Sequence, residues 1–74
     1  MVVFKNIIFD DEWIYATAED YTDKKVVTVK LHRHKEYYEC SEKTFDLVRA
    51  LWALQDDVNS GKVKQHSQTA VAWG

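Results

Sequence analysis

The sequence contains no proline, two glycines and one cysteine among its 74 residues. With so little proline and glycine it has no linker-like stretch, so we expect a single domain spanning residues 1–74. The lone cysteine, Cys40, excludes an internal disulfide, and the absence of a signal-like N-terminus adds to the prediction of a reducing, cytoplasmic location. No apolar run reaches the roughly 18 residues of a membrane span, so we expect a soluble protein without a membrane partner.

Glycine-rich phosphate-binding loops are excluded as well, because the two glycines are far apart in the sequence. Apolar residues make up 46% of the chain and aromatic residues 14%, a composition typical of an ordered fold. The net charge of −2 indicates no general attraction to nucleic acid. The charges are nevertheless unevenly distributed. Residues 24–35 carry five basic residues and no acid, whereas residues 1–23 carry six acids and one lysine.

Four segments rich in β-branched and aromatic residues predict strands, at residues 2–9, 13–19, 24–32 and 37–40. Polar turns at residues 10–11 and 20–23 separate the first three strands, while the bend at residues 33–35 lacks the usual turn residues. Such short connections favour antiparallel hairpins, because parallel pairing needs a longer crossover. Residues 69–73 alternate again and predict a possible C-terminal strand beside the sheet.

A helical period is strong only over residues 41–58, where the apolar side chains fall on one side and most charged ones on the other. Ser41 is the expected N-cap, and Gly61 is expected to close the helix. At the edge of the apolar arc, Phe45 and Trp52 are expected to be packing residues. Together the elements predict an α+β fold, an antiparallel meander of three to four strands with one amphipathic helix packed on one face.

One helix covers only one face of such a sheet. The residues expected to face the helix are Ile14, Ala16, Ala18, Val27, Val29 and Leu31. A second set is expected on the other face as a candidate protein interface: Val2, Phe4, Trp13, Tyr15, Val26 and Thr28.

The first strand alternates imperfectly, because Ile7 falls on the opposite side from Phe4 unless a β-bulge at Lys5-Asn6 shifts the phase. Two alternatives to an interface follow. In the first, one strand turns the opposite set of side chains toward the helix from the set assigned here. In the second, the C-terminal segment with Val71 and Trp73 covers the second face.

His32 and His34 form an H-x-H pair that could bind a metal together with Cys40 or His66. This spacing is a weak signal, and a solvated histidine pair is the favoured interpretation, so we predict no metal and no other cofactor. Cys40, beside the predicted helix N-terminus, is a candidate nucleophile if a histidine lies in reach. No catalytic signature surrounds it, and a small buried thiol is the ordinary interpretation. We therefore predict no catalytic residues and no enzyme activity.

The basic stretch supplies the strongest polar signal. Cations that contact phosphates and aromatic rings that stack on bases are typical of proteins that bind single-stranded nucleic acid. The candidate nucleic-acid contacts are Lys30, His32, Arg33, His34, Lys35 and Tyr37. Against this interpretation, acids close by in the sequence are expected to neutralise part of the stretch as cross-strand neighbours.

The leading prediction is a small non-enzymatic cytoplasmic protein that acts by protein–protein binding. We expect it to form a homodimer through the second sheet face or an edge strand, because monomers seldom expose large apolar patches. Its partners are then a second copy and an unidentified protein. The alternative is a nucleic-acid-binding module that uses the basic stretch.

Overall fold

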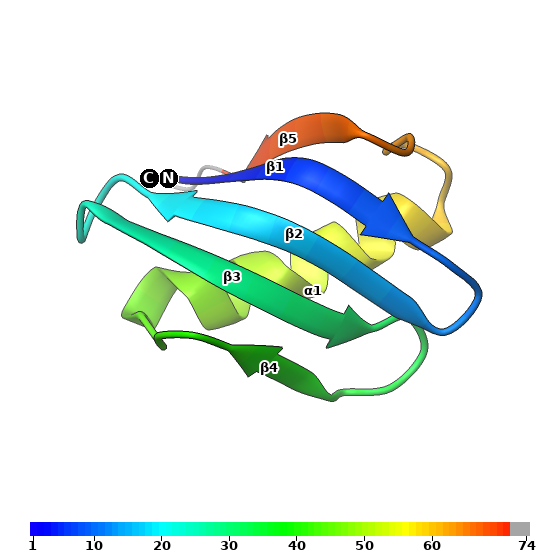
Figure 1. Ribbon diagram of the computed structural model, residues 1–74, viewed down its shortest axis with the longest axis horizontal. Helices are drawn as coiled ribbons and strands as arrows, with labels where there is room; N and C mark the ends of the chain where they lie inside the picture. The colour runs from blue at the N-terminus through cyan, green and yellow to red at the C-terminus, as the bar shows by residue number, and fades with distance from the viewer. Residues whose placement is uncertain (72–74) are drawn as a thin grey trace.

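Five strands and one helix make up the fold in a computed structural model that describes residues 1–71. The elements are β1 (Val2–Phe9), β2 (Trp13–Asp20), β3 (Lys25–His32), β4 (Tyr38–Cys40), α1 (Phe45–Asn59) and β5 (Ser67–Val71). The strands form one antiparallel sheet in the order β4-β3-β2-β1-β5, with the helix packed on one face (Figure 1). The predicted α+β meander is confirmed, and its C-terminal strand is present. The predicted extension of that strand to Trp73 lies outside the described residues.

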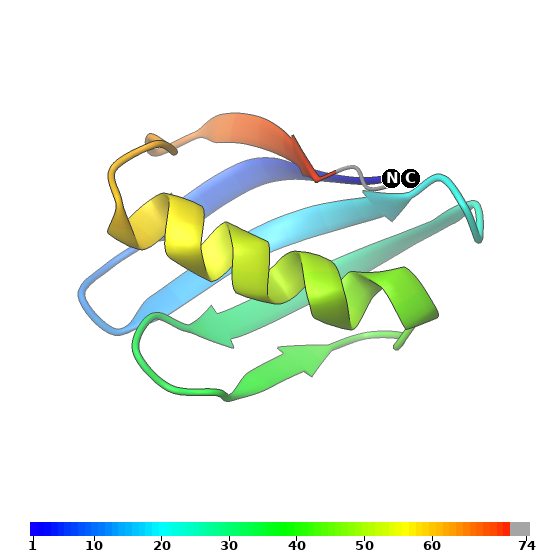
Figure 2. The ribbon, with the colours of Figure 1, turned by 180° about the vertical axis from the view of Figure 1, so that it is seen from behind.

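The helix connects the two edges of the sheet. It follows β4 at one edge and precedes β5 at the other, so it runs obliquely across the covered face (Figure 2). Figure 1 shows the opposite face, with the helix behind the strands. No helix within residues 1–71 is long and apolar enough to cross a membrane.

The core lies between α1 and the covered face of the sheet. The six residues predicted to face the helix are at most 7% exposed, which confirms that prediction: Ile14, Ala16, Ala18, Val27, Val29 and Leu31. From the helix come Leu47, Ala50, Leu51, Leu54 and Val58, also buried. Burial of each large aliphatic side chain contributes about 1.5–3 kcal/mol, so this layer is the main source of stability.

A β-bulge in β1 changes the predicted second face. Asn6 has a φ of 54°, and the pairing of β1 with β2 shifts between Lys5 and Ile8. Phe4 lies opposite Ala18 in the sheet, and therefore points toward the helix. The extra residue of the bulge then lets Ile7 point the same way. Val2, Phe4 and Ile7 are all fully buried in the core. The predicted placement of Val2 and Phe4 on the second face is therefore wrong.

The helix N-cap lies three residues later than predicted. Thr44 is the N-cap, because its hydroxyl accepts a hydrogen bond from the Leu47 N–H. Ser41 instead extends the pairing of β4 with β3. Its N–H donates to the Thr28 carbonyl, and its hydroxyl accepts from the Thr28 N–H. At the other end Gly61 adopts a φ of 79° just after the helix, and its N–H donates to Val58, as expected for a closing glycine.

Asp20 joins the helix N-cap to the sheet. It is 1% exposed and accepts a hydrogen bond of 2.5 Å from the Thr44 hydroxyl. Its other oxygen accepts from the N–H groups of Thr22 and Asp23 in the β2–β3 turn. Burial of the carboxylate opposes its ionisation, but the Thr44 bond and the two backbone bonds outweigh burial and lower the pKa of Asp20 below its usual value.

We expect Thr44→Ala to destabilise the fold by about 2 kcal/mol, because it removes a helix cap and one of the donors to the buried Asp20. Urea unfolding followed by circular dichroism measures this change. Thr22→Ala is the matched control, since the Thr22 hydroxyl accepts an exposed hydrogen bond from the N-terminal amine and caps no helix. Equal stability of the two variants would show that the Asp20–Thr44 contact contributes nothing.

Acid should destabilise the protein through the same carboxylate. The pKa of Asp20 is lower in the folded protein than in the unfolded chain, so its ionised form contributes stability above about pH 4. That contribution is lost as the pH falls through the folded-state pKa. We expect Asp20→Asn to lower stability at neutral pH and to flatten the fall in unfolding free energy below about pH 4. Unfolding measured from pH 2 to 7 tests this, with Asp56→Asn on the exposed helix surface as the control.

Candidate protein-binding surface

The sheet face opposite α1, called here the outer face, is a mixed apolar and charged surface. Its side chains alternate with those of the core along each strand. The residues on it include Val3, Lys5, Ile8, Trp13, Tyr15, Thr17, Glu19, Val26, Thr28, Lys30 and Glu39. Of the predicted interface residues, Trp13, Tyr15, Val26 and Thr28 do lie on this face. Ile8 was missed, because its side of the sheet is set by the bulge in β1. Lys30 was predicted only as a nucleic-acid contact.

Apolar side chains are exposed along much of the outer face. Val26 is 68% exposed, Ile8 46% and Tyr15 41%, and Tyr37 at the start of the β4 hairpin is 48% exposed. Ile8 and Tyr15 are cross-strand partners. Scattered exposed apolar residues are ordinary, but neighbouring ones on a continuous sheet make a coherent contact surface.

Trp13 is the centre of an aromatic cluster at one end of the outer face. The Lys30 Nζ lies 4.1 Å from the centroid of its ring, a cation–π contact. The His32 and Tyr37 rings meet Trp13 edge-on, with centroids 4.9 Å and 5.8 Å away. Trp13 is half-buried among these contacts, and a side chain restrained by its neighbours loses less entropy when a partner binds it.

The charges of the outer face nearly balance. Lys5 and Glu19 form a 3.1 Å ion pair across β1 and β2. Their hydrogen bond raises the pKa of Lys5 and lowers the pKa of Glu19, which stabilises both charged forms. Lys30 and Glu39 are cross-strand neighbours on β3 and β4. A face with two lysines and two glutamates does not select strongly for a partner of either sign.

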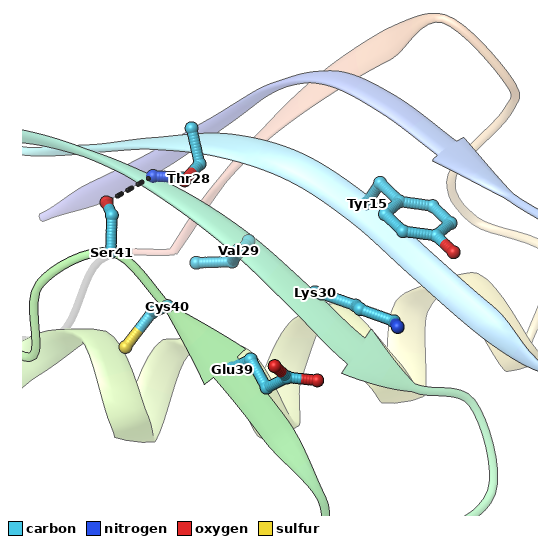
Figure 3. Close-up of a pocket in the computed structure, with 7 residues that line it drawn as sticks. All are labelled: Tyr15, Thr28, Val29, Lys30, Glu39, Cys40 and Ser41. Carbon is cyan, nitrogen blue, oxygen red and sulfur yellow. Dashed lines mark hydrogen bonds between the residues drawn. The ribbon is translucent and has the colours of Figure 1, made fainter.

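A shallow pocket of about 400 Å³ lies on the outer face beside β4. Tyr15, Thr28 and Lys30 line it from β2 and β3, and Glu39 and Ser41 from the β4 side (Figure 3). Figure 3 also shows the bond between Ser41 and Thr28 that closes one end. The pocket opens widely to solvent, so its geometry suits a side chain of a partner better than an enclosed small molecule.

The basic stretch is not a continuous cationic patch. Arg33 donates to the Asn59 side chain at 3.0 Å and to the Asp10 carbonyl at 2.9 Å, so its guanidinium joins three parts of the fold. His32 is buried, and a ring nitrogen of His34 lies 3.1 Å from the Asp11 carbonyl. Of the predicted nucleic-acid contacts, Lys30 and Tyr37 lie beside Trp13, while Lys35 is exposed in the loop.

His32 closes the β3–β4 loop. Its Nδ1 accepts hydrogen bonds from the N–H groups of His34 and Lys35, at 3.0 Å and 3.1 Å. Asp10 and Asp20 accept in the same way from residues two and three positions later in their own turns. The imidazole therefore takes the role that aspartate has in the other two turns, which explains how a bend without the usual turn residues forms.

The predicted metal and nucleophile candidates are not gathered into a site. Within residues 1–71, no three histidine, cysteine, aspartate or glutamate side chains are close enough to hold a metal ion. Cys40 ends β4, half-buried against the core, and lies four residues before the true N-cap. Cys40 thus stands at the strand-to-helix connection, as expected, and a role for its thiol as a nucleophile stays a prediction.

No protein-family model, curated protein or solved structure matches this chain. The outer face, its aromatic cluster and the open edges of the sheet are therefore the features from which a function can be argued.

We expect His32→Ala to destabilise the protein by about 2 kcal/mol, since it leaves two loop N–H groups without their acceptor and removes a ring packed on Trp13. His32→Asn should recover part of that loss, because its side-chain oxygen can take the place of Nδ1. Urea unfolding of both variants is the measurement. Equal destabilisation by alanine and asparagine would show that the acceptor role is unimportant.

Proposed function

We propose that the protein acts in the cytoplasm by binding other proteins, without catalysis, and that it forms a homodimer through the outer face. The observation that carries this proposal is the exposure of Ile8, Tyr15 and Val26 on a sheet face that no described element covers. A second copy is the simplest partner, because a two-fold axis lets the same face serve both chains.

The size of the outer face fits a modest dimer. The Cα atoms extend 31 × 20 × 19 Å, and the sheet faces the viewer along the shortest axis (Figure 1). The face is therefore about 600 Å² in projection, so two copies would bury roughly 1,200 Å² in total, near the lower limit of specific interfaces. An interface of this size is typical of reversible association rather than of an obligate dimer.

The charge pattern also favours self-association over nucleic acid. Two lysines and two glutamates on one face do not repel a second copy with the same face. A nucleic-acid backbone, in contrast, would meet Glu19 and Glu39 beside the two cations. Arg33, the strongest phosphate binder of the predicted set, is already bound to acceptors of the protein.

Light scattering coupled to size-exclusion chromatography tests the dimer. At about 100 µM we expect a concentration-dependent dimer. Tyr15→Glu should weaken it at least tenfold, because it places a new charge in the centre of the apolar contact. Phe45→Glu, on the helix side of the molecule, is the matched control and should leave the dimer unchanged. A strictly monomeric wild type at this concentration contradicts the proposal.

Nucleic-acid binding is the other outcome that this design detects. Fluorescence anisotropy with a mixed-sequence single-stranded oligonucleotide should give no binding at low salt if the face is a protein interface. Affinity that falls steeply with salt and is lost in Lys30→Glu would support the nucleic-acid alternative instead.

A further inference from the structure

Strand β4 leaves its far edge open. It stands at the end of the sheet order, with β3 as its neighbour on one side and none on the other among the described residues. The hydrogen bonds that join it to β3 run from the His32 N–H to the Tyr37 carbonyl and from the Ser41 N–H to the Thr28 carbonyl. Antiparallel bonds recur at every second residue, so the backbone groups of Tyr38 and Cys40 point away from β3.

Apolar side chains flank this edge on the helix side. Tyr38 and Cys40 pack partly against the core, and the Tyr38 ring meets Trp52 edge-on at 5.8 Å. Phe45, Val48 and Trp52 follow one another along the helix at spacings of three and four residues, so they share one side of α1. Phe45 was predicted to pack against the sheet, but it is 83% exposed. These five side chains are called here the apolar flank.

The opposite side of β4 carries a negative charge. Glu39 points to the outer face and borders the shallow pocket there. Its carboxylate accepts a hydrogen bond from the Tyr37 hydroxyl, and it forms no ion pair with any of the residues 1–71. An antiparallel pair of two β4 strands centred on this residue would set Glu39 against its own copy, and like charges directly opposite one another destabilise a sheet.

We infer that the β4 edge binds an extended peptide segment of a partner protein as an added antiparallel strand, with apolar residues alternating around a basic one. The apolar residues lie opposite Tyr38 and Cys40 and contact the apolar flank. The lysine or arginine between them lies opposite Glu39. The inference rests on the proposed protein-binding role. The added strand pairs with the β4 edge and meets the outer face at Glu39, so Tyr15 on the outer face and Phe45 on the helix side distinguish the two surfaces.

The added strand explains the exposure of the edge in chemical terms. Tyr38 and Cys40 together offer two N–H donors and two carbonyl acceptors, which a strand with the same alternation satisfies. Strand β4 is only three residues long and carries the charge of Glu39. Both features disfavour unspecific pairing of its edge with other strands. The charge of Glu39 makes the edge selective for a segment with a cation opposite that residue.

The test uses a fluorescein-labelled peptide, Gly-Ser-Val-Lys-Val-Ser-Gly, with a capped C-terminus, and fluorescence anisotropy with the full chain. We expect saturable binding that weakens at least tenfold when the valine amides are N-methylated, because those amides face β4. N-methylation of the lysine amide, which points away from β4, is the matched control and should have little effect. Equal binding of both methylated peptides, or no binding of the unmodified one, overturns the inference.

Charge reversal separates the edge from other sites. Glu39→Lys should weaken binding of the lysine peptide and restore it for a peptide with glutamate in its place. Phe45→Glu should weaken binding without changing the dimer, whereas Tyr15→Glu should weaken the dimer without changing peptide binding. Loss of peptide binding and loss of the dimer are therefore distinguishable, because different substitutions cause them.

Amide hydrogen exchange locates the peptide. The N–H groups of Tyr38 and Cys40 should exchange fast in the free protein and become protected when the peptide binds, while the Glu39 N–H, already paired with β3, changes little. Protection of Tyr38 and Cys40 in the free protein that grows with protein concentration would show that a second copy occupies the edge, and would overturn the inference.

Discussion

The architecture depends on a match between the length of one helix and the width of one sheet. Fifteen residues of α1 extend about 22 Å at 1.5 Å per residue, and five strands about 4.8 Å apart span about 19 Å. The helix is therefore long enough to cross the sheet obliquely from the β4 edge to the β5 edge (Figure 2). The large apolar residues that require burial therefore lie on the face that the helix crosses, and the outer face carries both apolar and charged side chains.

This constraint explains why part of the fold was accessible from the sequence. Residues in β2 and β3 alternate strictly, so the six core positions on them were predicted correctly. Strand β1 does not alternate, and only the backbone of Asn6 decides that Phe4 and Ile7 share a face. The sequence indicates a possible bulge at Lys5-Asn6 but does not decide whether it forms, and the predicted placement of Val2 and Phe4 was wrong for that reason.

Residues that looked functional in the sequence prove to be structural. Ser41 was the expected helix cap, yet its hydroxyl pairs with β3 while Thr44, held by Asp20, caps the helix. His32 and Arg33 suggested a metal or a phosphate, yet they organise the β3–β4 loop. The cause is the same in each case, since a polar side chain at a strand end satisfies the nearest backbone groups. Phe45 looked structural in the sequence but is exposed. Helical periodicity predicts the side of the helix on which a residue lies, but it does not predict whether the sheet extends far enough to cover that residue.

The pairing of the first and last strands has a practical consequence for how the molecule can be attached to others. Val2 lies opposite Val71 on one side and Asp20 on the other, and Asp20 lies opposite Lys25. A segment joined before Val2 or after Val71 therefore leaves from the end of the sheet where the β2–β3 turn lies. The Trp13 cluster and the β3–β4 loop lie at the other end. Tethering through either end of the chain keeps that distal end clear of the attachment point.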